Sequence, residues 1–404
     1  MNLNTNLTRE FIMTPNKNRP YDTSQELKAQ DVSQLVGKAL QEHFQLDMTN
    51  STYEEQDIFD VLVAACVEHI SIEMACKLLE DAPSGTLVRT RVKEMLRDIG
   101  QLAKIEANVN QLVSSSLPRK LLKSKLPAAI DATELPYHGK YDEEDKTVRR
   151  GKAKSGTTHF FSFVTLYVIK KHKRYTLAIV LMRKNEKAHE VVDRLLQRGE
   201  QLGVRIKRLY LDRGFDSNGV VAYLKSKPFP TIIPLTIRGK KGGSRALLVG
   251  RKSYKTTYRR KSTLYGEQSL PVVIVCKYSK GKYKRKGVFR FAYIVIGNLK
   301  MQPAQIAEEY RCRFGIEASY RLMNKVRART TCKKAEFRLF LVALAFFLLN
   351  MWAYVKWTYL FVSRPGPRTV LHHLLPLDQW RAWLWEMVKQ RLHLSLTVLI
   401  PMMA

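Results

Sequence analysis

The sequence predicts an α/β protein in which a mixed β-sheet with flanking helices follows an all-helical N-terminal domain. Three observations support this fold class. Residues 32–115 show helical periodicity, residues 125–234 alternate between strand and helix patterns, and residues 303–393 return to helices. The length of 404 residues fits two or three domains at a usual size of about 150 residues.

The N-terminal part divides into a polar segment and a helical domain. Residues 1–30 are polar and lack the apolar core of a secretion signal, so we expect a flexible segment and a cytoplasmic protein. We place the helical domain at residues 31–120 as a DNA-binding domain. The five cysteines form no Cys-x-x-Cys pair and are odd in number, which argues against disulfides and zinc ribbons and favours a reducing compartment.

Two long helix patterns lie in this domain, at residues 58–80 and 85–105, with the turn DAPSG between them. The second pattern contains Arg89, Arg91 and Lys93. A helix, a turn and a basic second helix are compatible with a helix-turn-helix that reads DNA. They are equally compatible with a small helical bundle of any function.

The central domain is predicted over residues 121–362. Its strands are short runs of apolar, β-branched and aromatic side chains, and its helices have amphipathic spacing. The predicted order is a strand at 128–132, strands at 160–169 and 175–182, a helix at 186–202, a strand at 206–211, a helix at 217–225 and a strand at 231–234. Because crossover units follow three consecutive strands, the sheet should be mixed with helices on both faces. Gly203 should end the first helix, and Ser217 should cap the second.

A basic segment at residues 235–287 interrupts this pattern. Between residues 238 and 290 there are 17 Lys and Arg and a single acid, Glu267. Strand patterns at 269–278 and 288–296 predict that the segment is a β-rich insertion.

Helices are predicted at residues 303–330 and 335–358, followed by a C-terminal helical tail at 363–404. Residues 339–355 contain 17 residues without a charge, close to the ~18 that suggest a membrane span. A helix packed on all sides has the same composition. Asn350 interrupts the run, and we favour a buried helix and no membrane partner.

The charge balance indicates a polyanionic partner. The chain has 69 Lys and Arg against 36 Asp and Glu, a net charge of +33 and a pI near 10.0. Such an excess is relieved when the protein binds a polyanion and releases its counterions. Nucleic acid is therefore the first partner to consider and an anionic membrane surface the second. A soluble basic protein without such a partner is the plain alternative.

Three acids stand where a catalytic centre can form. Asp131 lies near the end of the first strand, Asp212 follows the fourth strand, and Glu317 lies on a later helix. If the first and fourth strands are adjacent, the three carboxylates can meet at one sheet edge. Hard oxygen ligands suit Mg²⁺ or Mn²⁺, and two such ions about 4 Å apart catalyse phosphoryl transfer. Each aspartate alone is commonplace at a strand end, so only the combination predicts a site.

The helix around Glu317 has one polar face, formed by Tyr310, Arg313, Glu317 and Arg321. A carboxylate between two guanidinium groups stays ionised and faces a phosphate backbone together with them. The plain alternative is a solvated helix with ordinary ion pairs, worth only a few tenths of a kcal/mol. A second, buried face is predicted for Phe314, Ile316 and Leu322.

With these residues the sequence resembles the DDE transposases of prokaryotic insertion sequences, in the branch marked by Tyr-x2-Arg-x3-Glu-x6-Lys. Tyr310, Arg313 and Glu317 match that signature. The sequences IDAT around Asp131 and LDRGF around Asp212 resemble the first two acidic motifs of the family. The resemblance extends over about residues 125–358 and implies a ribonuclease-H-like catalytic domain with a β-rich insertion before the glutamate.

The chain departs from the family pattern in two places. Asn324 stands at the signature lysine, and Lys325 follows one residue later, about 100° around the helix. Either Arg321 or Lys325 replaces the phosphate contact, or activity is lost. Some relatives stack a flipped base on a Trp of the insertion, which has none here. Tyr254 or Tyr258 would stack the base instead, or no hairpin intermediate forms.

The resemblance implies metal-dependent cleavage of transposon ends and strand transfer into target DNA by a chain that dimerises on double-stranded DNA. Asp131, Asp212 and Glu317 would bind two Mg²⁺ or Mn²⁺ ions. The expected phosphate contacts are Tyr310, Arg313, Arg321, Lys325, Arg213, Arg259, Arg260 and Lys261. A structure-selective nuclease without strand transfer and a non-catalytic DNA-binding repressor are the alternatives.

Overall fold

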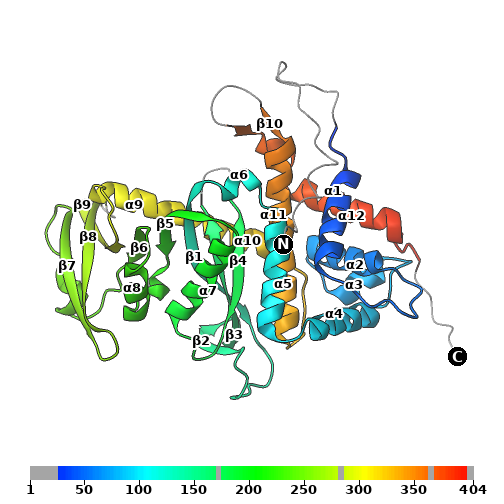
Figure 1. Cartoon of the computed structure of the whole chain (residues 1–404), viewed down its shortest axis with the longest axis horizontal. Coiled ribbons are helices and arrows are strands. Elements are labelled where there is room, and N and C mark those ends of the chain that lie inside the picture. Colours follow the sequence, from blue (N-terminus) through cyan, green and yellow to red (C-terminus); the bar gives the residue numbers. More distant parts are fainter. Residues whose placement is uncertain (1–25, 170–173, 281–285, 363–367, 398–404) are drawn as a thin grey trace.

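A computed structural model of the chain (Figure 1) describes residues 26–169, 174–280, 286–362 and 368–397. A mixed sheet with helices on both faces forms its centre, and a helical N-terminal region packs at one end of the sheet. The predicted fold class is confirmed at this level. Most of the predicted flexible segment at residues 1–30 lies outside the described residues, and the first helix begins at Ala29.

The N-terminal region contains α1 (Ala29–His43), α2 (Glu55–Val67), α3 (Ile72–Leu78), α4 (Gly85–Ile99), α5 (Leu102–Ser115) and α6 (Arg119–Leu122). The single helix predicted at 58–80 is therefore wrong: two helices form, and the side chain of Ser71 caps the second by accepting from Met74 N at 3.1 Å. The helix predicted at 85–105 ends at Ile99, because Gly100 adopts a φ of +99°.

Nine strands form the central sheet: β1 (Lys125–Pro136), β2 (Arg149–Lys154), β3 (Thr157–Val168), β4 (Thr176–Met182), β5 (Arg205–Leu211), β6 (Thr231–Pro234), β7 (Tyr254–Ser262), β8 (Gly266–Lys280) and β9 (Lys286–Ile296). Their order is β2-β3-β1-β5-β6-β9-β8-β7. Strand β4 also pairs with β3, on the edge of β3 that faces away from β1. Strands β1, β5 and β6 are parallel, and the other pairs are antiparallel. The basic insertion therefore extends the same sheet, because β9 pairs with β6.

Helices cover both faces of this sheet because its strands are apolar on both faces. On β3, Phe161 and Phe163 face the core shared with α5 and α11, whereas Val164 and Leu166 face the core below α7. The crossover elements on that second side are α7 (Ala188–Gln201), η1 (Arg213–Phe215) and α8 (Asn218–Lys225). Gly203, with a φ of +75°, follows the end of α7 as predicted.

The second half of the chain continues with η2 (Gly243–Leu247), α9 (Pro303–Arg311), η4 (Cys312–Phe314), α10 (Gly315–Lys325), α11 (Ala335–Tyr359), β10 (Phe361–Val362), β11 (Thr369–Val370), η5 (His372–Leu374) and α12 (Leu377–Leu392). The helix predicted at 303–330 is thus interrupted at Cys312 and ends at Lys325. Helix α12 packs on α1 and α2, so the predicted C-terminal tail completes the N-terminal helical region.

Helix α11 runs beside α5 between the sheet and the N-terminal helices (Figure 1). It is long and apolar enough to cross a membrane, but 83% of its most apolar window is buried inside the protein. Its polar interruption, Asn350, bonds to Val113 O at 2.8 Å and to both backbone groups of Thr176. The amide thereby links α5 and β4, and the prediction of a buried helix is confirmed.

Candidate active site

Two neighbouring strands bring the first two predicted acids together. Strands β1 and β5 are parallel, and Ile130 pairs with Leu211 in their register. Asp131 is the next residue of β1, and Asp212 directly follows the end of β5, so their backbones lie side by side where β5 ends. Asp131 was expected near the end of its strand, but β1 continues to Pro136 because it pairs with β3 over that length. Asp131 shares a sheet face with Ala129, which packs into the core on the side of α10 and α11.

The guanidinium group of Arg313 connects all three predicted acids. Its Nη1 lies 2.8 Å from Asp131 Oδ2, and its Nη2 lies 3.3 Å from Asp212 Oδ1 and 3.0 Å from Glu317 Oε1. Arg313 itself is only 5% exposed. The structure therefore brings Asp131, Asp212 and Glu317 to one place, with a buried cation between them.

Burial and charge act against each other in this cluster. The pKa of Asp131 is raised to about 6, because burial, together with the nearby charge of Asp212, outweighs the lowering by Arg313. Burial also disfavours the charge on Arg313, but Tyr310 and the three carboxylates outweigh burial and leave the pKa of Arg313 raised. Arg313 is consequently charged and acts as the shared counter-ion of the acids.

Two tyrosines on the helices α9 and α10 form hydrogen bonds to the backbone of β5 and β1 beside the acids. Tyr310 on α9 donates to Leu211 O at 3.1 Å, just before Asp212. Tyr320 on α10 donates to Asp131 O at 2.6 Å and also contacts Thr165 Oγ1. Tyr310 was predicted to contact DNA phosphate, but its buried hydroxyl is engaged with the backbone. Tyr320 was missed, although its place three residues after Glu317 puts it on a neighbouring helical face.

A polar cluster that the sequence analysis also missed fastens α9 to β5. Glu309 Oε2 accepts from Arg208 Nη1 and, at 2.7 Å, from the hydroxyl of Tyr210. Glu309 is about a hundred residues from Arg208 and Tyr210 in sequence, so no local sequence pattern predicts this contact. Because α9 leads directly into Arg313, this cluster fixes the approach of the guanidinium to the carboxylates.

Sequence comparison decides the family. The family model described as "Transposase DDE domain" matches residues 123–351, more than half of the chain and all three acids. The chain belongs to the DDE transposase family. Among curated proteins, none matches it.

The fold agrees with this family. It is similar to a piggyBac transposase, solved by cryo-EM as a synaptic complex with hairpin DNA, with a TM-score of 0.56 and 11% sequence identity. The match covers 94% of this chain and 84% of that chain. At this identity the likeness concerns the fold, which is that of a ribonuclease-H-like transposase with an N-terminal helical region.

DDE transposases typically use divalent metal ions, and the donor set of this transposase fits one. Three carboxylates supply hard oxygen ligands, and the second oxygen of Glu317 takes part in no hydrogen bond among the described residues. In that part of the chain no three Asp, Glu, His or Cys side chains surround a single point closely enough to hold an ion. Arg313 separates the carboxylates in this arrangement.

The polar face of α10 is exposed beyond Glu317. Arg321 and Lys325 follow Glu317 at spacings of four and eight residues, and all three side chains are exposed. No ion pair of either cation occurs among the described residues, so Glu317 is not held between two guanidinium groups as predicted. Arg213 beside Asp212 is exposed as well. Phe314, predicted to be buried, is 51% exposed.

The three predicted phosphate contacts of the insertion lie on strand β7, on two different faces of the strand. Its side chains alternate between exposed and half-buried, and Arg259 and Lys261 are on the exposed side. Arg260 points inward and pairs with Asp216 at 2.7 Å, with its side chain 14% exposed. Arg260 is thus engaged within the protein, and its predicted phosphate contact is not proposed further.

The aromatic side chains of the insertion also differ from expectation. Tyr254 and Tyr258, predicted to stack a base, are half-buried and pack on the core below the sheet. Three other aromatic residues are at least 43% exposed: Tyr278, Phe289 and Phe291.

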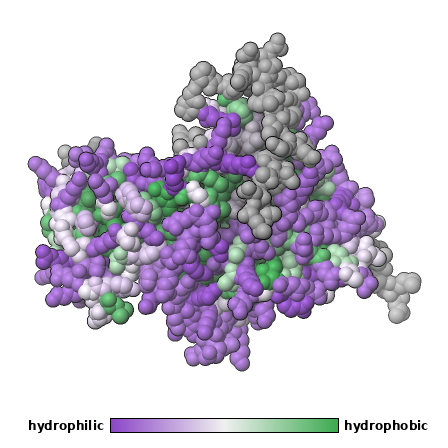
Figure 2. Space-filling view, viewed as in Figure 1, coloured by the Kyte–Doolittle hydropathy of each residue, from purple (hydrophilic) through white to green (hydrophobic). Residues whose placement is uncertain are grey.

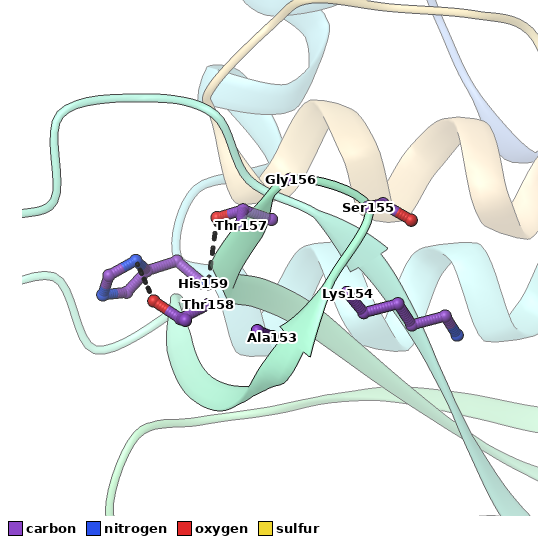
Figure 3. Close-up of a pocket in the computed structure, with 7 residues that line it drawn as sticks. All are labelled: Ala153, Lys154, Ser155, Gly156, Thr157, Thr158 and His159. Carbon is purple, nitrogen blue, oxygen red and sulfur yellow. Dashed lines mark hydrogen bonds between the residues drawn. The ribbon is translucent and has the colours of Figure 1, made fainter.

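Two further features of the surface lie away from the acids. In α4, Arg89 pairs with Glu73 and Arg91 pairs with Glu94, so carboxylates neutralise two of the three cations named for the expected DNA-reading helix, and Lys93 is exposed. An open hollow at the β2–β3 turn (Figure 3) is lined by residues 153–159 of one hairpin. None of the three acids lines this hollow.

Hydrophilic side chains cover most of the face shown in Figure 2.

Proposed function

We propose that this DDE transposase catalyses metal-dependent DNA strand cleavage and strand transfer of an insertion sequence, as a member of the branch with the Tyr-x2-Arg-x3-Glu signature. The observation that carries the proposal is the convergence of Asp131, Asp212 and Glu317 on Arg313. They come from two adjacent parallel strands and one helix, and the family model spans them. Unrelated surface acids would not share one buried cation.

In the proposed reaction the three carboxylates would hold the metal, and the chain positions two of them on adjacent strands and one on a helix. Bound Mg²⁺ or Mn²⁺, as one ion or two, would lower the pKa of water and stabilise the charge of the phosphoryl group in transit. Asp131 presents its oxygens from the middle of β1 and Asp212 from the end of β5, and Tyr320 and Tyr310 hold these positions through the backbone. Glu317 is 47% exposed and closes the site from the helix.

The cations around the acids provide a surface for the DNA backbone. Arg213, Arg321 and Lys325 lie beside the acids and are exposed. Arg321 and Lys325 replace the signature lysine, whose position is occupied by Asn324. Arg259 and Lys261 add positive charge on the outer side of the insertion. The partner is double-stranded DNA, at the ends of the element and at the target.

Cleavage of paired ends requires two active sites, and we therefore propose a dimer on DNA. The structural neighbour is a synaptic complex with hairpin DNA, which supports this assembly for a protein of the same fold. We place the reaction in the cytoplasm, on the nucleoid. The helical region at residues 31–120 and the insertion would bind the element ends, although Arg89 and Arg91 are engaged within the protein.

The test measures nicking of a supercoiled plasmid and duplex binding by wild type and by Asp131→Asn. Asp131→Asn should lower the nicking rate at least about a hundredfold, because it removes one ligand charge from the metal site, while duplex affinity is retained. Glu308→Gln removes an exposed carboxylate on α9 outside the cluster and is the matched control. Nicking by Asp131→Asn at the wild-type rate would refute the assignment.

A second assay separates a transposase from a nuclease. A plasmid carrying the DNA that flanks the coding region is incubated with the protein and a target plasmid, and joined products are amplified and sequenced. Strand transfer predicts joined ends at a fixed element boundary. Metal-dependent cleavage without joined products would favour the nuclease.

A further inference from the structure

Strand β7 presents two chemically different sides of the insertion. Its outer side has the exposed cations Lys255, Arg259 and Lys261, which alternate along the strand. Its inner side contains Arg260, between two of them in sequence. Because successive strand residues point to opposite faces, a contact on the outer side acts directly on the backbone that holds Arg260.

Arg260 forms a buried ion pair with the segment that follows Asp212. Its Nη1 lies 2.7 Å from Asp216 Oδ1, and the side chain of Asp216 is 0% exposed. The other carboxylate oxygen of Asp216 accepts from Thr236 N at 2.6 Å. The Nε and Nη2 atoms of Arg260 have no hydrogen-bond partner among the described residues, so this pair is the main anchor of the guanidinium.

Asp216 is rigidly connected to Asp212. The intervening residues form the turn η1, in which Phe215 N donates to Asp212 O and Asp216 N donates to Arg213 O, each at 3.0 Å. Phe215 is buried in the core between them. A shift of Asp216 therefore moves the backbone of Asp212, since the turn has little freedom to absorb it.

We infer that Arg260 is a positioning residue, whose ion pair with Asp216 couples DNA contact on the outer side of β7 to the placement of the Asp212 carboxylate. This inference rests on the proposed function. Phosphates bound by Arg259 and Lys261 fix the position of β7. The Arg260–Asp216 ion pair then fixes the position of the turn η1. This turn determines where the carboxylate of Asp212 lies relative to Asp131. Arg260 contacts neither DNA nor metal in this account.

The first experiment separates positioning from binding and from stability. Arg260→Gln and Asp216→Asn should lower the nicking rate at saturating supercoiled plasmid at least about tenfold, because a small displacement of a catalytic group is costly. Affinity for a short fluorescein-labelled duplex of arbitrary sequence should stay within about twofold, which is under 1 kcal/mol. Arg260→Lys should recover part of the rate, since it restores the charge.

The matched control breaks a buried ion pair elsewhere. Arg194 lies 2.9 Å from Glu106, which joins α7 to α5, and the side chains are 25% and 5% exposed. Arg194→Gln should lower the thermal midpoint by about as much as Arg260→Gln and leave the saturated nicking rate unchanged. Equal loss of nicking in both variants would overturn the inference, as would a wild-type rate in Arg260→Gln.

A second measurement does not depend on activity. Duplex binding should slow hydrogen exchange of the backbone amides at 212–217 in the wild-type protein, and this protection should be lost in Arg260→Gln and in Asp216→Asn. Asp216→Asn retains an acceptor for Thr236 N and serves where Arg260→Gln does not fold. Undiminished protection in the variants would contradict the coupling. A wild-type protein that fails to nick would instead count against the proposed function, and the exchange experiment would still decide the coupling.

Discussion

Arg313 dominates the electrostatics of the acidic cluster. Three carboxylates within 3.3 Å of one guanidinium would repel one another without it. The burial of Asp131 is tolerated because the guanidinium beside it is also buried and is always charged. The signature arginine therefore has a structural task in the free protein besides any contact with phosphate.

Removal of this cation should destabilise the protein and make its stability dependent on metal. Arg313→Met leaves partly buried carboxylates without a counter-ion, and we expect a loss of about 3–5 kcal/mol in the free energy of unfolding. Added Mn²⁺ should restore part of this loss in thermal unfolding, because the ion replaces the missing charge. Arg321→Met, on the exposed stripe of α10, is the control and should change stability little. An Arg313→Met protein as stable as wild type would contradict this role.

At the scale of residues, the sequence predicts which acids lie close together in the site. It gives less information on whether a side chain points toward solvent or into the protein. The proximity of Asp131 and Asp212 is predictable because each follows an apolar run on one of two strands that pair in parallel, although β1 continues past Asp131 to Pro136. Arg260 is not, because β7 lacks the apolar alternation that would have identified it as a strand with an inner side. Tyr310 matches a signature, but only the fold shows that its hydroxyl bonds to Leu211.

At the scale of elements, α11 contains an unusual buried lysine. Lys356 is 6% exposed, and its ammonium lies 3.0 Å from the centroid of the Trp352 ring. Burial lowers the pKa of Lys356 to about 7 from an ordinary value of 10.5. At neutral pH the folded protein therefore loses part of the charge that the unfolded chain retains, which costs stability.

This residue predicts a pH dependence of stability. The folded pKa is depressed, so the folded state binds fewer protons than the unfolded state between about 7 and 10.5, and stability should rise with pH over that window. Lys356→Met should stabilise the protein at neutral pH, on the order of 3 kcal/mol, and remove its share of this slope. Thermal unfolding of both proteins across the window measures the effect. Parallel stability curves for the two proteins would show that Lys356 is not the cause.

Local sequence patterns predict some helices and strands of this protein and fail to predict others or their ends. The long apolar run of α11 was predictable from composition, since a buried helix needs no polar face. The helix predicted at 303–330 is interrupted at Cys312, next to Arg313, which contacts Asp131 and Asp212 of the sheet, and such long-range contacts are not contained in a local pattern. Short exposed strands such as β2 escape prediction because their side chains are largely charged.

At the scale of the whole molecule, the net charge of +33 should dominate DNA binding. Binding to a duplex should weaken steeply with salt, since each neutralised phosphate contributes about −0.9 to the slope of log affinity against log salt concentration. Lys261→Gln removes one outward cation of β7 and should reduce the magnitude of the slope by about 1. Fluorescence anisotropy titrations over a salt series measure it. A slope close to zero would contradict a backbone-binding surface.

The large-scale arrangement depends on contacts that sequence patterns do not contain. The order of domains along the chain suggested a separate C-terminal tail, yet α12 completes the N-terminal helical region. The insertion likewise continues the central sheet through the pairing of β9 with β6. Such pairings join residues far apart in sequence, so the strand and helix patterns predicted a mixed sheet, and the family resemblance implied its ribonuclease-H-like fold.

A metal-specificity switch at Asp131 tests the central claim most directly. Asp131→Cys replaces a hard oxygen ligand with a thiolate, which binds softer ions in preference to Mg²⁺. We predict that Asp131→Cys does not nick supercoiled plasmid in Mg²⁺ and recovers nicking in Mn²⁺ or Zn²⁺, whereas wild type is active in Mg²⁺. A cysteine variant that is as active as wild type in Mg²⁺, or inactive with every metal while still binding duplex, would contradict a metal-ligand role for Asp131.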